Sequence, residues 1–288
     1  MCSILQTKAI NLVAAVNDKD ACMSDHLLPG LYDALITTDI QEKLVDSPLY
    51  QQTEPLAPEW SHERLAELLT ELLSRTLAET RVTENNKSLA QAELINELVR
   101  FLQLRAMHLG LPEVALPPSL LKAVSPVAAM PDLPSIGLAQ PWLFTAGRDS
   151  PPLLHELQAE LACCDQVDIL VSFITVSGVR KIIDTLKRIT SADAQGRSQT
   201  TLRVLTTTYT GATEQKALDM LAQLPNTEVR ISLDGRRTRL HAKAWIFQRE
   251  TGFGSAYVGS ANLSGAALMG GLEWTVKFTE KGQNNLFH

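Results

Sequence analysis

The chain has 288 residues, of which 45% are hydrophobic and 20% are charged. This composition is typical of a folded globular protein long enough for two domains, and it excludes a mainly disordered chain. The formal net charge of −6 does not by itself indicate a nucleic-acid binder. No apolar run approaches the roughly 18 residues of a membrane span, and the first residues lack the pattern of a signal peptide. We therefore expect a cytoplasmic protein with no membrane partner.

Residues 1–110 have the periodicity of helices. The segment "SHERLAELLTELLSRTLAET" places six leucines on one stripe at helical spacing, and "SLAQAELINELVRFLQL" continues the pattern. The leucines of the stripe are Leu65, Leu68, Leu69, Leu72, Leu73 and Leu77. We predict a smaller all-α N-terminal domain of bundled helices, which serves as a scaffold or, alternatively, docks a partner.

The segment 111–147 is rich in proline. Seven of the 14 prolines fall between Pro112 and Pro141, which excludes one regular element over this stretch. We predict a linker here, with a domain boundary inside it.

From residue 148 to residue 288 the pattern changes to alternating short strands and helices. Strands are predicted at 166–174, 201–209, 228–234, 240–248, 255–261 and 272–280, and helices at 177–190, 212–224 and 263–269. Strands separated by helices imply crossover connections and a mostly parallel or mixed sheet that helices cover on both faces. The predicted fold class is therefore α/β.

One short region, "RLHAKAWIFQRETGFGSAYVGSANLSGAALMGGLEW", gathers most of the polar chemistry. His241 and Lys243 lie two residues apart on a predicted strand, so both side chains project from one face. A lysine beside an imidazole suits an anion such as a phosphate. Ser260 and Asn262 follow the next strand at a turn of small residues, where side chains and backbone N–H groups hold phosphate oxygens. Glu273 follows, and we expect its carboxylate to orient the imidazole of His241.

Basic residues cluster just before this region. Between residues 228 and 249 six basic side chains face two acidic ones, Glu228 and Asp234, and the six are Arg230, Arg236, Arg237, Arg239, Lys243 and Arg249. A positive strip on an acidic chain fits an anionic ligand, but a solvated strand-and-turn face has the same pattern. Arg236, Arg237 and Arg239 are the predicted substrate-binding arginines.

The pattern HxK followed by GSxNxS and a Glu resembles the signature of the phospholipase D superfamily. The matching residues are His241, Lys243, Ser260, Asn262, Ser264 and Glu273. The fuller motif has an Asp five residues after the Lys, where this chain has Gln248. That departure weakens the case for lipid hydrolysis more than the case for nucleic-acid cleavage, because the nuclease branch of the superfamily tolerates it.

Four segments also resemble the front part of bacterial proteins that join a phospholipase D-like nuclease domain to a superfamily 2 helicase. They are "LLPGLYDALIT", "VDILVSFITVSGV", "RRTRLHAKAWIF" and "TGFGSAYVGSANLSGAALMGGLEW". The resemblance implies a piece of a longer polypeptide with a helicase domain, and a role in DNA processing or in defence against phage.

Together these patterns predict a nuclease that cleaves DNA in preference to RNA through a phosphohistidine at His241. Lys243, Asn262, Ser260 and Glu273 complete the catalytic set, and Ser264 binds substrate. No cluster of ligands has the spacing of a metal site, so we expect neither metal nor cofactor. Because the chain has one HxK, the second histidine that the chemistry needs must come from another copy, in a homodimer.

Two alternatives remain open: a DNA-binding or assembly module that keeps the fold without turnover, and a phospholipid-directed phosphodiesterase. For several other residues we expect a structural role. Cys163 and Cys164 fit the packing of a helix end, and Asp168 fits a strand-edge charge better than a catalyst. Trp245 and Phe247 fit a core or a site wall, with base stacking as the alternative.

Overall fold

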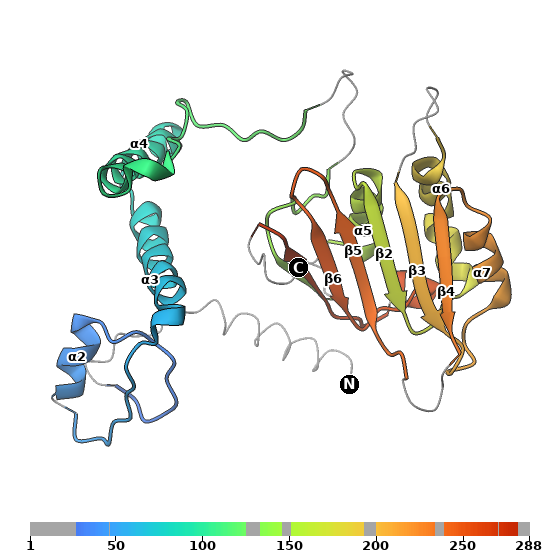
Figure 1. Ribbon diagram of the computed structural model, residues 1–288, viewed down its shortest axis with the longest axis horizontal. Helices are drawn as coiled ribbons and strands as arrows, with labels where there is room; N and C mark the ends of the chain where they lie inside the picture. Colours follow the sequence, from blue (N-terminus) through green and yellow to red (C-terminus); the bar gives the residue numbers. More distant parts are fainter. Residues whose placement is uncertain are drawn as a thin grey trace. The chain divides into compact units, whose positions relative to one another are not determined.

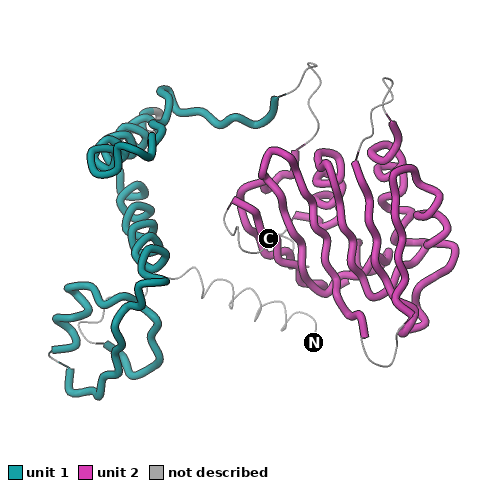
Figure 2. The backbone as a smooth tube through the Cα atoms, in the orientation of Figure 1, with its two compact units in different colours: residues 1–124 teal, residues 125–288 magenta. Residues whose placement is uncertain are grey.

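A computed structural model describes residues 27–45, 47–124, 133–145, 151–192, 200–233, 239–269 and 271–281. The chain divides into two compact units, Met1–Val124 and Ser125–His288 (Figure 2). The division falls inside the segment predicted as a linker.

Unit 2 is built on one seven-stranded mixed sheet with the order β1-β7-β6-β5-β2-β3-β4 (Figure 1). The strands β2, β3 and β4 are parallel, whereas β5, β6, β7 and β1 each pair antiparallel with their neighbour. The strands are β1 (Trp142–Phe144), β2 (Gln166–Val171), β3 (Thr201–Thr207), β4 (Thr227–Ser232), β5 (Lys243–Gln248), β6 (Ser255–Gly259) and β7 (Thr275–Thr279). The predicted α/β class with a mixed sheet flanked by helices is confirmed.

The helices of unit 2 lie together behind the sheet in the view of Figure 1. They are α5 (Leu153–Ala162), α6 (Val176–Thr190), α7 (Gln215–Ala222) and α8 (Gly265–Met269), and they pack on one another as α5 with α6 and α8, and α6 with α7 and α8. Within the described residues of unit 2, no helix lies on the other face of the sheet, so these helices do not cover both faces as predicted. The antiparallel half needs no helical crossovers to a parallel neighbour, because β5 leads to β6 through a short connection and β6 leads to its antiparallel neighbour β7 through the segment that contains α8.

The alternation of side chains along the strands sets the core. On β2, the fully buried side chains of Val167, Ile169 and Val171 face the helices. Trp245 and Phe247 on β5 are 3% and 0% exposed and stack on each other, which confirms that they belong to the core. These aromatic rings are therefore closed to a nucleobase.

A buried ionic network ties α5 to the antiparallel half of the sheet. The carboxylate of Glu160 contacts the Nη2 of Arg249 at 2.6 Å and the Nζ of Lys277 at 2.9 Å, and it accepts a hydrogen bond from the Tyr257 hydroxyl at 2.9 Å. Burial raises the pKa of Glu160, but the attraction of Arg249 and Lys277 outweighs burial and leaves that pKa lowered. Two positive charges around one carboxylate satisfy groups that would otherwise be costly to bury.

The two adjacent cysteines lie at the end of α5. The Cys163 thiol donates to the Ala159 carbonyl at 3.2 Å, and Cys164 is buried in the core. Burial raises the pKa of the Cys164 thiol to about 12. The interpretation of this pair as helix-end packing is confirmed.

Unit 1 contains α2 (Thr38–Val45), α3 (Pro58–Ala78), α4 (Glu84–Arg105) and the 3₁₀ turn η1 (Met107–Leu109). The predicted leucine stripe lies on α3, which buries no residue, and Leu65, Leu69 and Leu72 remain about half exposed. The stripe therefore forms the predicted helix without forming a bundle core within the described residues. None of the helices described is both long and apolar enough to cross a membrane.

Two elements of unit 2 were not located by sequence patterns: β1 was not predicted at all, and α5 was indicated only by its end at Cys163 and Cys164. Strand β1 falls inside the segment predicted as a linker, and it adds an antiparallel edge next to β7. The Nζ of Lys277 also donates to the Gly137 carbonyl at 2.6 Å, which fixes this segment against the sheet. Along α5 the buried carboxylates of Glu156 and Glu160 interrupt the apolar pattern, so periodicity does not show where this helix begins.

Candidate active site

The residues of the HxK and GSxNxS segments meet at one end of the sheet. Strand β5 begins at Lys243, which pairs with Val171 at the carboxyl end of β2. Strand β6 ends at Gly259, which pairs with Thr275 at the start of β7. Because β5 and β6 are antiparallel neighbours, the start of one lies beside the end of the other. The topology thus gathers segments that are up to about a hundred residues apart in the chain.

Lys243 lies at the centre of this group. Its Nζ is 2.9 Å from Nδ1 and 3.2 Å from Nε2 of His241, and it donates to the His241 carbonyl at 3.1 Å. The lysine is 9% exposed, whereas His241 is exposed. His241 precedes β5 instead of lying on it, so the pair meets through the length of the lysine side chain. The imidazole is open to an incoming ligand while the ammonium lies behind it.

The electrostatics of Lys243 have two opposing causes. Burial lowers the pKa of its ammonium, and the nearby negative charge of Glu273 raises it, with burial the larger effect. A partly buried lysine with a lowered pKa is suited to bind an anion, since a negative charge next to the ammonium stabilises its protonated form.

Asn262 joins the loop after β6 to the end of β2. Its Oδ1 accepts hydrogen bonds from the backbone N–H groups of Ser172 and Phe173 at 3.1 and 3.2 Å. The Asn262 Nδ2 has no hydrogen-bond partner among the described residues and is not one of the fully buried, unpartnered polar atoms. The amide nitrogen is therefore accessible as a donor to an anion.

Ser260 and Glu273 pair with each other across the ends of β6 and β7. The Ser260 hydroxyl donates to the Glu273 carboxylate and accepts from the Trp274 backbone N–H at 3.1 Å. The structure places Glu273 against Ser260, and no hydrogen bond joins it to His241 within the described chain. Its link to the HxK pair is the electrostatic effect on Lys243.

Gly259 allows this close approach of the two strand ends. A Cβ at this position would lie 2.1 Å from the Trp274 carbonyl oxygen, a distance that no side chain tolerates. Close packing of the two strand ends therefore explains why the GSxNxS segment begins with a glycine.

The remaining predicted residues lie around this centre. The Ser264 hydroxyl accepts from the Ala267 backbone N–H at 3.2 Å at the start of α8. Arg239 is exposed, and Arg236 and Arg237 lie outside the described residues. Arg249 is buried against Glu160, so the interpretation of residues 228–249 as one positive surface strip is wrong for this residue. Its distance from the surface follows from its position on the core-facing side just after β5.

Gln248 is the last residue of β5 and is exposed. Five residues along a strand span about 16 Å, so this side chain lies far from Lys243, at the opposite end of the strand. Gln248 is therefore not one of the side chains that surround His241.

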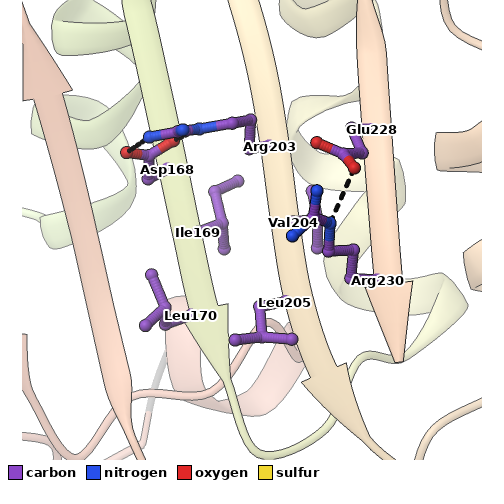
Figure 3. Close-up of a pocket in the computed structure, with 8 residues that line it drawn as sticks. All are labelled: Asp168, Ile169, Leu170, Arg203, Val204, Leu205, Glu228 and Arg230. Carbon is purple, nitrogen blue, oxygen red and sulfur yellow. Dashed lines mark hydrogen bonds and ion pairs between the residues drawn. The ribbon is translucent and has the colours of Figure 1, made fainter. Parts of the chain in front are cut away.

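A hollow of about 220 Å³ lies on the helix-free face of the sheet, over β2, β3 and β4 (Figure 3). Arg203 donates to Asp168 through Nε and Nη2 at 2.6 and 2.5 Å, and Arg230 donates to Glu228 at 2.6 Å. These charges are paired within the sheet, and none of the lining residues belongs to the HxK or GSxNxS segments. Asp168 on β2 thus forms an ion pair with Arg203 on the neighbouring strand β3, which is a structural role.

Sequence patterns did not single out Ser172. Its hydroxyl accepts from the Lys243 Nζ at 3.1 Å and donates to the Ala242 carbonyl at 3.4 Å, and the residue is 1% exposed. The available signal was a small polar residue directly after the buried apolar run "VDILV", where a strand end faces a site.

Comparisons with known proteins give structural similarity only. No family model matches the chain, and no curated protein matches it. Among solved structures, it is similar to NucT from Helicobacter pylori, at 18% identity and a TM-score of 0.38, over 50% of this chain and 87% of that one. It is also similar to Nuc from Salmonella typhimurium, a phospholipase D family member, at 13% identity and a TM-score of 0.34, over 51% and 88% of the two chains.

Proposed function

We propose that this protein is a metal-independent phosphodiesterase that cleaves nucleic acid, with DNA as the expected substrate. The observation that carries the proposal is the contact of the Lys243 ammonium with both ring nitrogens of the exposed His241. The Asn262 amide, anchored on the same strand end, is a second donor for a phosphate. A nucleophile beside a cation and an amide donor is the arrangement that phosphoryl transfer requires.

The reaction proceeds in two displacements. A ring nitrogen of His241 attacks phosphorus, so that a P–N bond forms as the bond to the leaving oxygen breaks. An acid on the opposite side gives its proton to that oxygen. Water then attacks phosphorus, the P–N bond breaks, and the former acid takes a proton from the water. Lys243 and Asn262 stabilise the charge on the equatorial oxygens in both steps.

The acid in this scheme is His241 of a second copy. One HxK motif supplies one histidine, so a homodimer with the two His241 side chains on a shared two-fold axis completes the site. The loops at this end of the sheet are the proposed contact. Ser264 and the arginines Arg236, Arg237 and Arg239 are proposed to bind the nucleic-acid backbone. A helicase domain in a longer polypeptide, acting in DNA processing or phage defence, is the proposed setting.

The alternative is a non-catalytic DNA-binding or assembly module, which the loss of an acidic residue at Gln248 favours. The position of Gln248 at the far end of β5 argues against this alternative, because the residue lies about 16 Å along the strand from Lys243. The structural role of an Asp there is separable from the chemistry at His241.

Hydrolysis of a small chromogenic phosphodiester tests the proposal. We expect turnover in excess chelator, abolished in His241→Ala and retained in His155→Ala, since His155 is an exposed histidine of α5 outside the motif. Nucleic acid and a phospholipid are then offered as competing substrates. Binding of DNA without turnover would instead establish the non-catalytic module, and preference for the lipid would establish the phospholipid-directed enzyme.

A further inference from the structure

We infer that Ser172, a residue outside the HxK and GSxNxS segments, is a positioning residue of the candidate active site. It holds the side chains of Lys243 and Asn262 in place relative to each other. A catalytic effect of Ser172 rests on the proposed function. The hydrogen bonds of Ser172 are observed whether or not the protein is a phosphodiesterase.

Ser172 is the point where three chain segments join. Its hydroxyl accepts from the Lys243 Nζ at 3.1 Å, and its backbone N–H donates to the Asn262 Oδ1 at 3.1 Å. The same hydroxyl donates to the Ala242 carbonyl at 3.4 Å, between His241 and Lys243 in the chain. One residue at the end of β2 therefore fixes both proposed phosphate donors.

The orientation of the hydroxyl follows from its partners. Lys243 has only donors, so the Ser172 oxygen must accept from it, and the Ser172 proton is directed to the Ala242 carbonyl. A hydroxyl that accepts from an ammonium favours the charged form of the lysine. At 1% exposure, water cannot replace this acceptor without rearrangement.

Other groups around Lys243 cannot take over this role. The titratable ones are the His241 ring, the Glu273 carboxylate and the Tyr257 hydroxyl. Glu273 acts on the ammonium as a nearby charge and forms no hydrogen bond to it within the described residues, and the Tyr257 hydroxyl donates to Glu160. The other side chains that share a small cavity with Lys243 are Leu153, Leu157, Trp245, Ala261 and Thr275. Ser172 is thus the side-chain oxygen bonded to the ammonium within the described residues.

The experiment separates the hydroxyl from the backbone. Ser172→Ala removes the acceptor for Lys243 but keeps the N–H that holds Asn262. The matched control is Ser255→Ala, because Ser255 is also a fully buried serine of the same sheet and its Oγ has no hydrogen-bond partner among the described residues. Ser172→Thr retains a hydroxyl and serves as the conservative rescue. Ser172→Cys, with a similar volume and a weak acceptor, replaces the alanine variant should the latter fail to fold.

Lys243 is titrated directly in the full chain by ¹³C-lysine NMR, with its signal assigned by its loss in Lys243→Arg. We expect the midpoint of Lys243 to move to lower pH in Ser172→Ala and in Ser172→Cys, and to stay at the wild-type pH in Ser255→Ala and Ser172→Thr. Diester kcat/KM should fall about ten-fold in Ser172→Ala with its alkaline limb at lower pH, as loss of a hydrogen bond to a charged group predicts.

An unchanged Lys243 midpoint in Ser172→Ala would overturn the inference, as would an equal shift in Ser255→Ala. The failure of the proposed function is distinguishable, because a wild-type protein that hydrolyses no diester still gives a titration. A shifted midpoint without any wild-type turnover would support the positioning role and reject the phosphodiesterase.

Discussion

At the scale of one residue, the burial of Lys243 and its proposed role in binding a phosphate have opposite effects on its protonation. Burial favours loss of its proton, while its proposed task requires a positive charge. Four oxygen and nitrogen atoms of Ser172 and His241 lie within hydrogen-bond distance of its Nζ. The charge of Glu273 offsets part of the effect of burial on the pKa of Lys243. The residue therefore controls the pH range in which the site can hold a phosphate.

The first prediction concerns that pH range. The pKa of Lys243 lies below its ordinary value of 10.5, so the cation is present at lower pH and is lost as pH rises through the lowered pKa. Diester kcat/KM should therefore fall on an alkaline limb below the ordinary range of lysine. Glu273→Gln removes the charge that raises this pKa, and the limb should move to still lower pH.

Glu228→Gln is the matched control, because Glu228 pairs with Arg230 on the helix-free face of the sheet, away from the motif residues. A pH profile for Glu273→Gln that superimposes on that of Glu228→Gln would show that Glu273 does not act on Lys243.

At the scale of elements, the network around Glu160 determines how α5 is held against β6 and β7. The folded pKa of Glu160 lies below its ordinary value of 4.5. The carboxylate therefore stabilises the fold above the pKa of the unfolded chain, and this contribution is lost as pH falls through the folded pKa.

The second prediction is that Glu160→Gln lowers the free energy of unfolding by about 3–5 kcal/mol near neutral pH, because Arg249 and Lys277 remain buried without their counter-charge. The difference from wild type should shrink as pH falls through the acid range. Denaturant unfolding measures both effects. Glu228→Gln at an exposed ion pair should change stability by less than about 1 kcal/mol, and an equally small effect for Glu160→Gln would contradict the prediction.

The same elements show what sequence patterns can predict. Strands β2 to β7 and helices α6 to α8 follow from periodicity, because each presents one apolar face at a regular spacing. The start of β5 was predicted three residues early, since the apolar pattern of "LHAKAWIF" does not show that His241 leaves the sheet. β1 was missed because it is three residues long and gains its stability from pairing with β7.

The sequence motif predicted those site residues whose own side chains are proposed to act on the substrate. His241, Lys243, Ser260 and Asn262 do gather at one sheet end. The partner of Glu273 could not be predicted, because whether a carboxylate meets His241 or Ser260 depends on the exact packing of two strand ends. Ser172 was missed because its role depends on pairing between β2 and β5, more than 70 residues later in the chain.

At the scale of the whole molecule, the proposed active unit is larger than the chain. The third prediction uses mixtures of wild-type and His241→Ala chains. A mixed dimer keeps one histidine and should be inactive, since attack and protonation need both. After subunit exchange at equal concentrations, about a quarter of the dimers are wild-type pairs by random pairing. Activity should fall to about that fraction of what the same total protein gives as wild type, and a value near half would show that each copy works alone.

The most direct test of the central claim is capture of the covalent intermediate. Wild-type protein is mixed with a phosphodiester in excess chelator, quenched rapidly in alkali and digested for mass spectrometry. The account predicts that the peptide containing His241 carries the phosphoryl half of the substrate on its imidazole, and that Lys243→Met, which lacks the cation, yields much less of it. Turnover with no adduct at His241, or an adduct at another residue, would contradict the proposed mechanism.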